Sequence, residues 1–251
     1  MDTEKKFNQI LEDSRNDDNI IAFWLDGSRG KGMITEYSDY DCTMIVKDEV
    51  LVEYKSKYEK LGNLAIELKV MTLNEFKTSA GWTLDKRWER YNYAHIKPLV
   101  DKTGQLQELF YEKASIPDKE MRSFINVNLD HYINQVYRSL KCFRDNKNVG
   151  ARLEAANSII PLLNVIFGLH NRLCPYYKYF EWELEKFPLE KLSLSSEEFT
   201  KSVLMILENG DMTTQQRILK EIENVSKKEG YKEIWNSWDA KLEWMKSFNS
   251  D

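Results

Sequence analysis

The chain of 251 residues has few cysteines and histidines, no basic excess and no long apolar run. Its three cysteines are odd in number and widely spaced, so they form neither a CxxC pair nor a disulfide framework. The three histidines are equally scattered, which argues against a zinc site. The longest apolar run, residues 159–169, is interrupted by Pro161 and Asn164 and is too short to span a bilayer. The first six residues lack the apolar segment of a signal peptide, so we expect a cytoplasmic protein with no membrane partner.

The charge balance is mildly acidic, with a formal net charge of −5. General nucleic-acid binding needs a basic face for phosphate contacts, so we expect no nucleic-acid partner. Hydrophobic residues make up 42% of the chain, which is enough for a core, and 31% charged with 12% aromatic residues exclude a disordered chain. The length allows one large domain or two modest ones.

A glycine-rich segment, residues 26–32, directly follows the apolar run 20–25. Asp39 and Asp41 come after a spacer of ten residues that follows Ser28, at the head of a second apolar run. If both runs are strands, the period of two puts both aspartates on one face. The turn would then offer backbone N–H groups and the Ser28 hydroxyl to a phosphate, and the two carboxylates would hold a divalent metal. The pattern predicts phosphoryl or nucleotidyl transfer.

In Gly27, Ser28, Asp39 and Asp41 the chain resembles the nucleotidyltransferase superfamily that includes DNA polymerase beta. The stretch 27–41 is most similar to that of small bacterial enzymes that adenylylate antibiotics, such as the lincosamide and aminoglycoside nucleotidyltransferases. This resemblance implies that an AMP group moves from ATP to a hydroxyl of a small molecule, with two Mg²⁺ ions stabilising the attacking and leaving oxygens. The acidic charge balance suits a cationic acceptor.

The resemblance makes Asp39 and Asp41 the metal ligands, and Ser28 with the backbone from Gly27 onward the binding site for the β- and γ-phosphates. The segment is not a Walker A loop, because no Gly-Lys-Ser/Thr follows at the required spacing. Arg29 or Lys31 could reach a phosphate, and each could equally be a solvated side chain. Cys42 follows Asp41 directly, so on an alternating strand it is expected to point away from the metals into the core.

Glu67 is the third carboxylate candidate, isolated in the apolar run 64–71. An unpaired charge is costly to bury, and a metal or a substrate hydroxyl would relieve that cost. By resemblance, Glu67 is a ligand of the second metal or a general base on the acceptor hydroxyl. The alternative is that it faces water beside Lys69 on an edge strand.

The second half of the chain is expected to shape the acceptor site. By resemblance, Glu154 lines the substrate cleft and helps to activate the hydroxyl, or else it forms a salt bridge on the helix surface with Arg152. Tyr177 belongs to an aromatic cluster, residues 176–182, which could stack on a base or sugar or could be core packing. Lys178 is a candidate contact of the triphosphate.

The periodicity of apolar residues predicts an α+β protein with a mixed sheet followed by a helical bundle. We place a nucleotidyltransferase domain at residues 1–110 and a helical acceptor-binding domain at residues 117–251. Thr72 and Glu75 have the spacing of a capping box. Strands are expected at about 20–25, 39–47, 64–71 and 96–100, and helices at 3–15, 49–61, 72–76, 117–140, 149–173, 178–187, 196–208, 212–229 and 231–248.

Other functions remain open. The protein could adenylylate another protein, as superfamily members paired with helical toxin domains do, or it could be a nucleotide sensor without turnover. Addition of nucleotides to RNA ends fits the acidic charge poorly. Related enzymes often dimerise, so a homodimer is possible.

Overall fold

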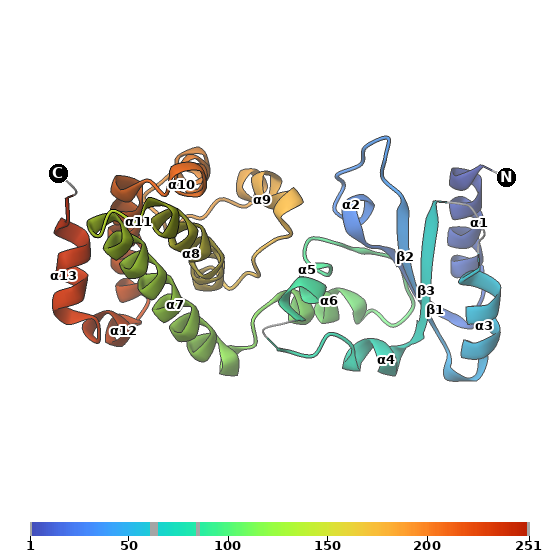
Figure 1. Ribbon diagram of the computed structural model, residues 1–251. Helices are drawn as coiled ribbons and strands as arrows, with labels where there is room; N and C mark the ends of the chain where they lie inside the picture. The colour runs from blue at the N-terminus through green and yellow to red at the C-terminus, as the bar shows by residue number, and fades with distance from the viewer. Residues whose placement is uncertain (1, 61–64, 84–85, 250–251) are drawn as a thin grey trace. The chain divides into compact units, whose positions relative to one another are not determined.

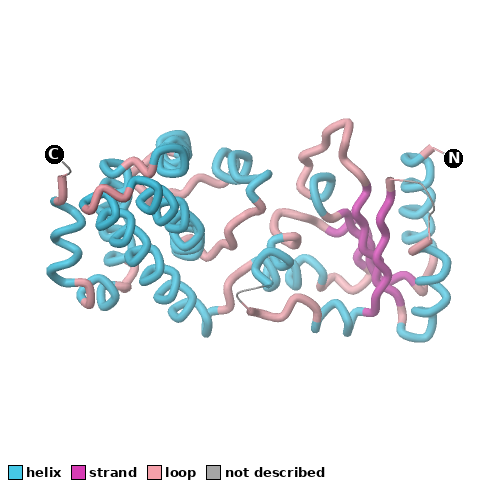
Figure 2. The backbone as a smooth tube through the Cα atoms, viewed as in Figure 1, coloured by secondary structure: helices cyan, strands magenta, loops and turns pink. Residues whose placement is uncertain are grey.

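The computed structural model describes residues 2–60, 65–83 and 86–249. The chain divides into two compact units, Met1–Ser115 and Ile116–Asp251. The first contains strands and helices, and the described part of the second consists of helices and their connections (Figures 1 and 2). This confirms the α+β class. Within the described residues, none of the helices has the length and hydrophobicity that a membrane span requires.

A four-stranded sheet with the order β3-β2-β1-β4 organises the first unit. Strand β1 is antiparallel to both β2 and β4, whereas β2 and β3 are parallel. All four strands occur where the apolar patterns predict them, although residues 61–64, which include the predicted helix end and strand start, lie outside the described part of the chain. The strands are β1 (Ile20–Leu25), β2 (Tyr40–Val46), β3 (Ile66–Thr72) and β4 (Pro98–Asp101).

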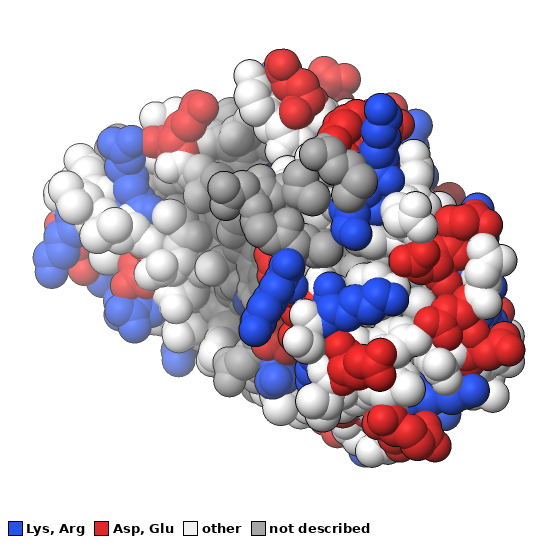
Figure 3. Space-filling view, turned by 90° about the vertical axis from the view of Figure 1, so that its right-hand side faces the viewer, with Lys and Arg blue, Asp and Glu red and all other residues white. Residues whose placement is uncertain are grey.

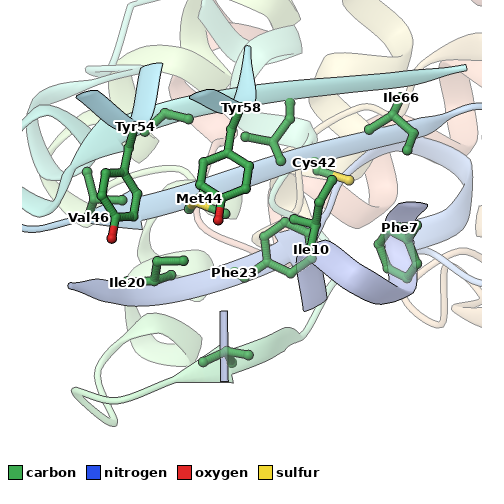
Figure 4. Close-up of a cluster of buried hydrophobic side chains, with 13 residues drawn as sticks. Phe7, Ile10, Ile20, Phe23, Cys42, Met44, Val46, Tyr54, Tyr58 and Ile66 are labelled. Atoms are coloured by element: carbon green, nitrogen blue, oxygen red, sulfur yellow. The ribbon is translucent and has the colours of Figure 1, made fainter. Parts of the chain in front are cut away.

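One face of the sheet is covered by α1 (Thr3–Asn16) and α3 (Leu51–Tyr58), which follows the short 3-10 helix η1 (Asp48–Val50) (Figure 1). Alternate residues of the strands point into this layer, and Figure 4 shows Phe23, Cys42 and Met44 among them. Cys42 is only 3% exposed, so the prediction that it points into the core is confirmed. Burial raises the pKa of its thiol well above the ordinary value.

The opposite face is covered by α4 (Leu73–Thr78) and α6 (Leu106–Ala114). Trp24 of β1 contacts Phe76 and Phe110 there, with ring centroids 5.1 Å apart in both pairs. The predicted capping box is confirmed, because the Thr72 hydroxyl accepts from the Glu75 N–H and the Glu75 carboxylate accepts from the Thr72 N–H. Asp41 and Glu67 belong to this second face, since their neighbours Cys42 and Leu68 belong to the first.

The second unit is built around two long helices, α7 (Asp118–Arg144) and α8 (Asn148–Leu169), which pack along each other. The C-terminal half of α8 is buried almost all round, as expected for a helix enclosed by others, and it continues through Pro161. The remaining elements are η3 (Tyr177–Tyr179), α9 (Phe180–Lys186), α10 (Ser196–Asn209), α11 (Met212–Lys228), α12 (Lys232–Asn236) and α13 (Asp239–Ser247).

The patterns were wrong in three places. No helix was predicted where α6 lies, between the strand expected at 96–100 and the helix expected from residue 117. The single helix predicted over 231–248 is interrupted between α12 and α13, where Asp239 has a φ of 35°. The short helix α5 (Arg87–Tyr91) was not predicted, because a single helical turn leaves little periodicity to read.

Candidate functional site

The turn after β1 lies in close contact with β2. It forms the four-residue helix α2 (Gly27–Gly30), which contains Ser28. Gly27 has a φ of 56°, and a Cβ on it would be 2.6 Å from Oδ2 of Asp41. A Cβ on Gly30 would collide with the carbonyl oxygen of Leu25. A side chain at either position would collide with neighbouring atoms, so both positions require glycine. At Gly27, the predicted phosphate-binding turn is in contact with Asp41, a predicted metal ligand.

Asp41 and Glu67 are aligned on neighbouring parallel strands. The register of β2 and β3 pairs Asp41 with Glu67 and Thr43 with Lys69. Paired residues of adjacent strands project from the same face, so both carboxylates and Lys69 share one side of the sheet. Glu67 and Lys69 are exposed, whereas Asp41 is partly buried. Glu67 thus lies on the same side of the sheet as Asp41 and is open to water beside Lys69, as the alternative expected. Its role as a metal ligand or general base stays a prediction.

Asp39 lies one residue before β2 and is exposed. The loop that leads to it is held by Arg29. The Nε of Arg29 donates to the carbonyl oxygen of Asp39 at 2.9 Å, and its Nη2 donates to that of Ser38 at 2.8 Å. The guanidinium also lies 3.7 Å from the centre of the Tyr40 ring. Arg29 therefore has a definite positioning contact, whereas its contact with a phosphate stays a prediction.

Lys31 is buried, with 7% of its surface exposed. Its Nζ donates to the carbonyl oxygens of Tyr91 and Asn92 at 3.2 Å, and to that of Ala94. These contacts tie the glycine-rich turn to the segment 91–94, which lies 60 to 63 residues later in the chain. The ammonium is engaged within the protein here, and a phosphate contact by Lys31 would require it to leave these carbonyls.

Asp26, which stands between β1 and Gly27, was not among the expected site residues. Its Oδ1 accepts from Nε1 of Trp24 at 2.9 Å, and its Oδ2 accepts from the Thr43 hydroxyl at 2.7 Å. Its backbone N–H donates to the carbonyl oxygen of Asp41 at 2.8 Å. Asp26 therefore joins the end of β1 to β2 directly beneath the turn. The available signal was an acidic residue that ends an apolar run immediately before Gly-Ser.

The pKa of Asp26 is raised to about 6, chiefly because burial disfavours the charged form. The hydrogen bonds from Thr43 and Trp24 and the charge of Lys31 lower the pKa, and the neighbouring charge of Asp41 raises it. Two carboxyl groups close enough to interact thus stand at the turn, and Asp26 holds a proton more readily than an ordinary aspartate.

Within residues 2–60, 65–83 and 86–249, no group of three or more His, Cys, Asp or Glu side chains is gathered closely enough to hold a metal ion. The metal set of Asp39, Asp41 and Glu67 therefore stays a prediction. The chemistry of the donors fits Mg²⁺, which prefers carboxylate oxygens and is commonly bound through one or two carboxylates together with substrate phosphates. The pair Asp39 and Asp41 meets that requirement without Glu67.

Glu154 of the second unit is engaged in an ion pair between helices. Its Oε1 lies 2.6 Å from Nη2 of Arg138 on α7 and accepts from Nε of the same guanidinium at 2.8 Å. The partner is thus Arg138 rather than the predicted Arg152, which donates instead to the carbonyl oxygen of Glu208. A helix-surface salt bridge was one of the two expectations for Glu154, but the predicted partner was wrong because Arg138 lies on a different helix, α7.

Tyr177 and Lys178 line a cavity of about 450 Å³ in the second unit. Both are exposed, and the Nζ of Lys178 lies 4.7 Å from the centre of the Tyr179 ring. Tyr179 itself is buried, so the aromatic cluster divides between core and cavity. Whether the cavity holds the acceptor and whether Lys178 contacts a triphosphate stay predictions.

Acidic and basic side chains are interspersed on the face of the first unit drawn in Figure 3, with uncharged residues between them. Among the residues of that face that the structure describes, Lys and Arg form no continuous stripe of the kind that tracks a phosphate backbone.

Comparison with known proteins gives little independent information. No protein-family model matches the chain, and no curated protein matches it. Among solved structures, the chain is similar to the crystal structure of a nucleotidyltransferase-like protein from Exiguobacterium sibiricum 255-15, with 11% sequence identity and a TM-score of 0.40. The match covers 96% of this chain and 77% of that chain. At this TM-score the likeness supports no statement about the site.

Proposed function

We propose that this protein is a nucleotidyltransferase that moves an AMP group from ATP to a hydroxyl of a small molecule. The observation that carries the proposal is the contact between the glycine-rich turn and the acidic strand: Gly27 lies against the Asp41 carboxylate, which in turn is aligned with Glu67. A phosphate-binding turn beside carboxylates on one sheet face is the arrangement that phosphoryl chemistry needs.

In the proposed mechanism, Ser28 and the amides of the turn bind the β- and γ-phosphates, and Asp39 and Asp41 hold Mg²⁺. The bound ion would neutralise the charge of the triphosphate and act as a Lewis acid on its oxygens. Asp26 keeps the turn against β2, and Arg29 keeps the backbone at Asp39 in place.

Glu67 is proposed as the general base because it is exposed on the face that also carries Asp41. It would accept the proton of the acceptor hydroxyl. The acceptor oxygen then bonds to the α-phosphorus, the bond from that phosphorus to the bridging oxygen breaks, and pyrophosphate leaves with the electron pair.

For the acceptor we propose a cationic small molecule, with aminoglycosides and lincosamides as the classes to test first. The net charge of −5 supports a cationic acceptor. The antibiotic classes rest on the resemblance of residues 27–41 alone. A homodimer and the absence of a nucleic-acid partner belong to the same proposal.

A second candidate is a nucleotide sensor that binds ATP without turnover. The observation that favours it is that three carboxylates are not gathered into a metal-binding group in the described part of the chain. A sensor would bind Mg-ATP and release no pyrophosphate with any acceptor.

The test is incubation with ATP labelled at the α-phosphate, Mg²⁺ and a panel of aminoglycosides and lincosamides. Label on a small molecule is expected with the wild-type protein and should be lost in Asp41→Asn. Asp18→Asn, an exposed aspartate outside the site, is the matched control and should keep the activity. Label on a protein would instead indicate protein adenylylation, and no pyrophosphate release with any acceptor would indicate the sensor.

A further inference from the structure

The cavity of the second unit lies between α8, α10 and the segment formed by η3 and α9. Its volume of about 450 Å³ is in the range of pockets that enclose small organic molecules. Every residue that lines it belongs to the second unit, so it is built independently of the glycine-rich turn and its carboxylates.

Aliphatic side chains form the two long walls of the cavity. They come from α8 and α10, and they are Ile159, Ile160, Leu163, Val203, Leu204 and Leu207. Ile160, Leu204 and Leu207 remain 48%, 49% and 45% exposed. Large aliphatic side chains that line a concave surface and still present half of their area to water favour an apolar occupant.

One part of the cavity wall is held in place by its packing against the core of the unit. Phe180 forms part of the lining, and its ring contacts Phe167 and Phe199 with centroids 6.4 and 6.3 Å apart. Both of these rings are buried in the core of the unit. A ligand would therefore meet a preformed wall and would not have to order it.

Two charged side chains lie at the cavity, and they are not equivalent. The Nζ of Lys178 lies on the Tyr179 ring at 4.7 Å, a cation–π contact. Glu181, one helical turn further on, forms no ion pair in the part of the chain that the structure describes. A carboxylate ligand that paired with Lys178 would pull its ammonium away from the Tyr179 ring and would lie near the like charge of Glu181. An ammonium ligand could instead form an ion pair with Glu181.

We propose that this cavity binds a small amphipathic amine with a single positive charge. Its aliphatic body packs between α8 and α10, and its ammonium pairs with Glu181. The exposed ring of Tyr177, which also lines the cavity, offers a second favourable surface to a cation. A molecule with several charges is disfavoured, because its remaining ammonium groups would be buried against aliphatic walls.

The test uses three probes that share one alkyl chain: n-octylamine, n-octanol and n-octanoate, each titrated calorimetrically into the full-length protein. Octylamine should bind most tightly, octanol more weakly and octanoate most weakly. Tighter binding of octanoate, or no binding by any probe, would overturn the proposal.

Two matched variants test the pairing with Glu181. Glu181→Gln should weaken octylamine about three- to fivefold, the effect of an exposed ion pair, and leave octanol unchanged. Glu185→Gln changes an exposed glutamate of the same helix that does not line the cavity, and it should change neither. Equal weakening by both variants would contradict a direct contact.

Two further variants test the apolar walls. Ala156→Phe should fill the cavity and weaken all three probes, with circular dichroism and thermal unfolding used to check the fold. Leu207→Gln alters a half-exposed wall residue without removing core packing, so it keeps the test valid if the larger side chain disturbs α8. Unchanged binding in a folded variant contradicts the assignment, as does sedimentation showing that a second copy of the chain covers this wall in the wild type.

Discussion

The guanidinium of Arg29 stacks on the ring of Tyr40, 3.7 Å from its centre, while its Nε donates to the carbonyl oxygen of Asp39. One side chain of the glycine-rich turn thus contacts both the backbone just before β2 and the side chain of the first residue of β2. The planar guanidinium can stack and donate at the same time, which an ammonium cannot do.

Arg29→Lys should therefore loosen the loop that leads to Asp39 while leaving the sheet folded. We expect faster hydrogen exchange at the amides of residues 35–39 and weaker binding of Mg-ATP. Arg15→Lys, at the exposed end of α1, should leave both unchanged. Exchange rates at 35–39 that equal those of the wild type would show that Arg29 does not position this loop.

Gly27→Ala should abolish nucleotide binding. The substitution places a methyl group 2.6 Å from Oδ2 of Asp41 and forces a non-glycine residue to a φ of 56°. The backbone strain alone costs about 1–2 kcal/mol of stability, and the clash displaces either the turn or the carboxylate.

Gly32→Ala separates these two effects. Gly32 has a φ of 74°, but a Cβ on it would have no atom within 4 Å. It should lose a similar amount of stability in chemical denaturation and still bind nucleotide. Equal loss of binding in both variants would show that strain, and not the approach to Asp41, is responsible.

Asp26 should make stability fall as the pH rises from about 4 to 6. Its pKa is about 6 in the folded protein, above the ordinary value of 3.8, so in this window the folded state binds the proton and the unfolded state does not. Below the window both states are protonated, and above it both are ionised. The full effect is about 3 kcal/mol at most, from 1.36 kcal/mol per pKa unit.

Asp26→Asn removes this titration and keeps an oxygen that can accept from Thr43 or Trp24. The difference in unfolding free energy between wild type and variant should therefore change between pH 4 and 6, and become constant above about pH 7. Denaturant titrations across this range measure it. A difference that does not vary with pH would refute the raised pKa.

The ion pair of Glu183 and Arg172 should be important for the stability of the second unit. Glu183 is 1% exposed, and its Oε1 lies 2.5 Å from Nη2 of Arg172. Glu183→Ala leaves the guanidinium, itself only 20% exposed, without this partner and should cost about 3 kcal/mol. Glu185→Ala, on the exposed side of α9, should cost less than about 0.5 kcal/mol. Similar melting temperatures for both variants would contradict a stabilising role.

Much of the first unit could be predicted because its strands carry a local signal. The apolar run 20–25 and the alternation at 66–71 mark β1 and β3, and Thr72 with Glu75 marks the start of α4. The spacing of Gly27, Asp39 and Asp41 pointed to the turn and the acidic strand that the structure brings into contact at Gly27 and Asp41.

What could not be predicted depends on contacts between distant residues. Lys31 is buried because the segment 91–94 turns its carbonyl oxygens toward it, and no local pattern marks that segment. Glu154 pairs with Arg138 because α7 and α8 pack along each other. Asp26 joins β1 to β2 because Trp24 and Thr43 both donate hydrogen bonds to it, and this arrangement depends on the pairing of the two strands.

The most direct test is calorimetric binding of a non-hydrolysable ATP analogue, with and without Mg²⁺, to the wild-type protein and to Asp41→Asn. If the turn and the acidic strand together form a nucleotide site, the wild type binds the analogue more tightly with Mg²⁺, and Asp41→Asn loses that gain. Equal binding by both proteins, whether or not Mg²⁺ is present, would contradict the account.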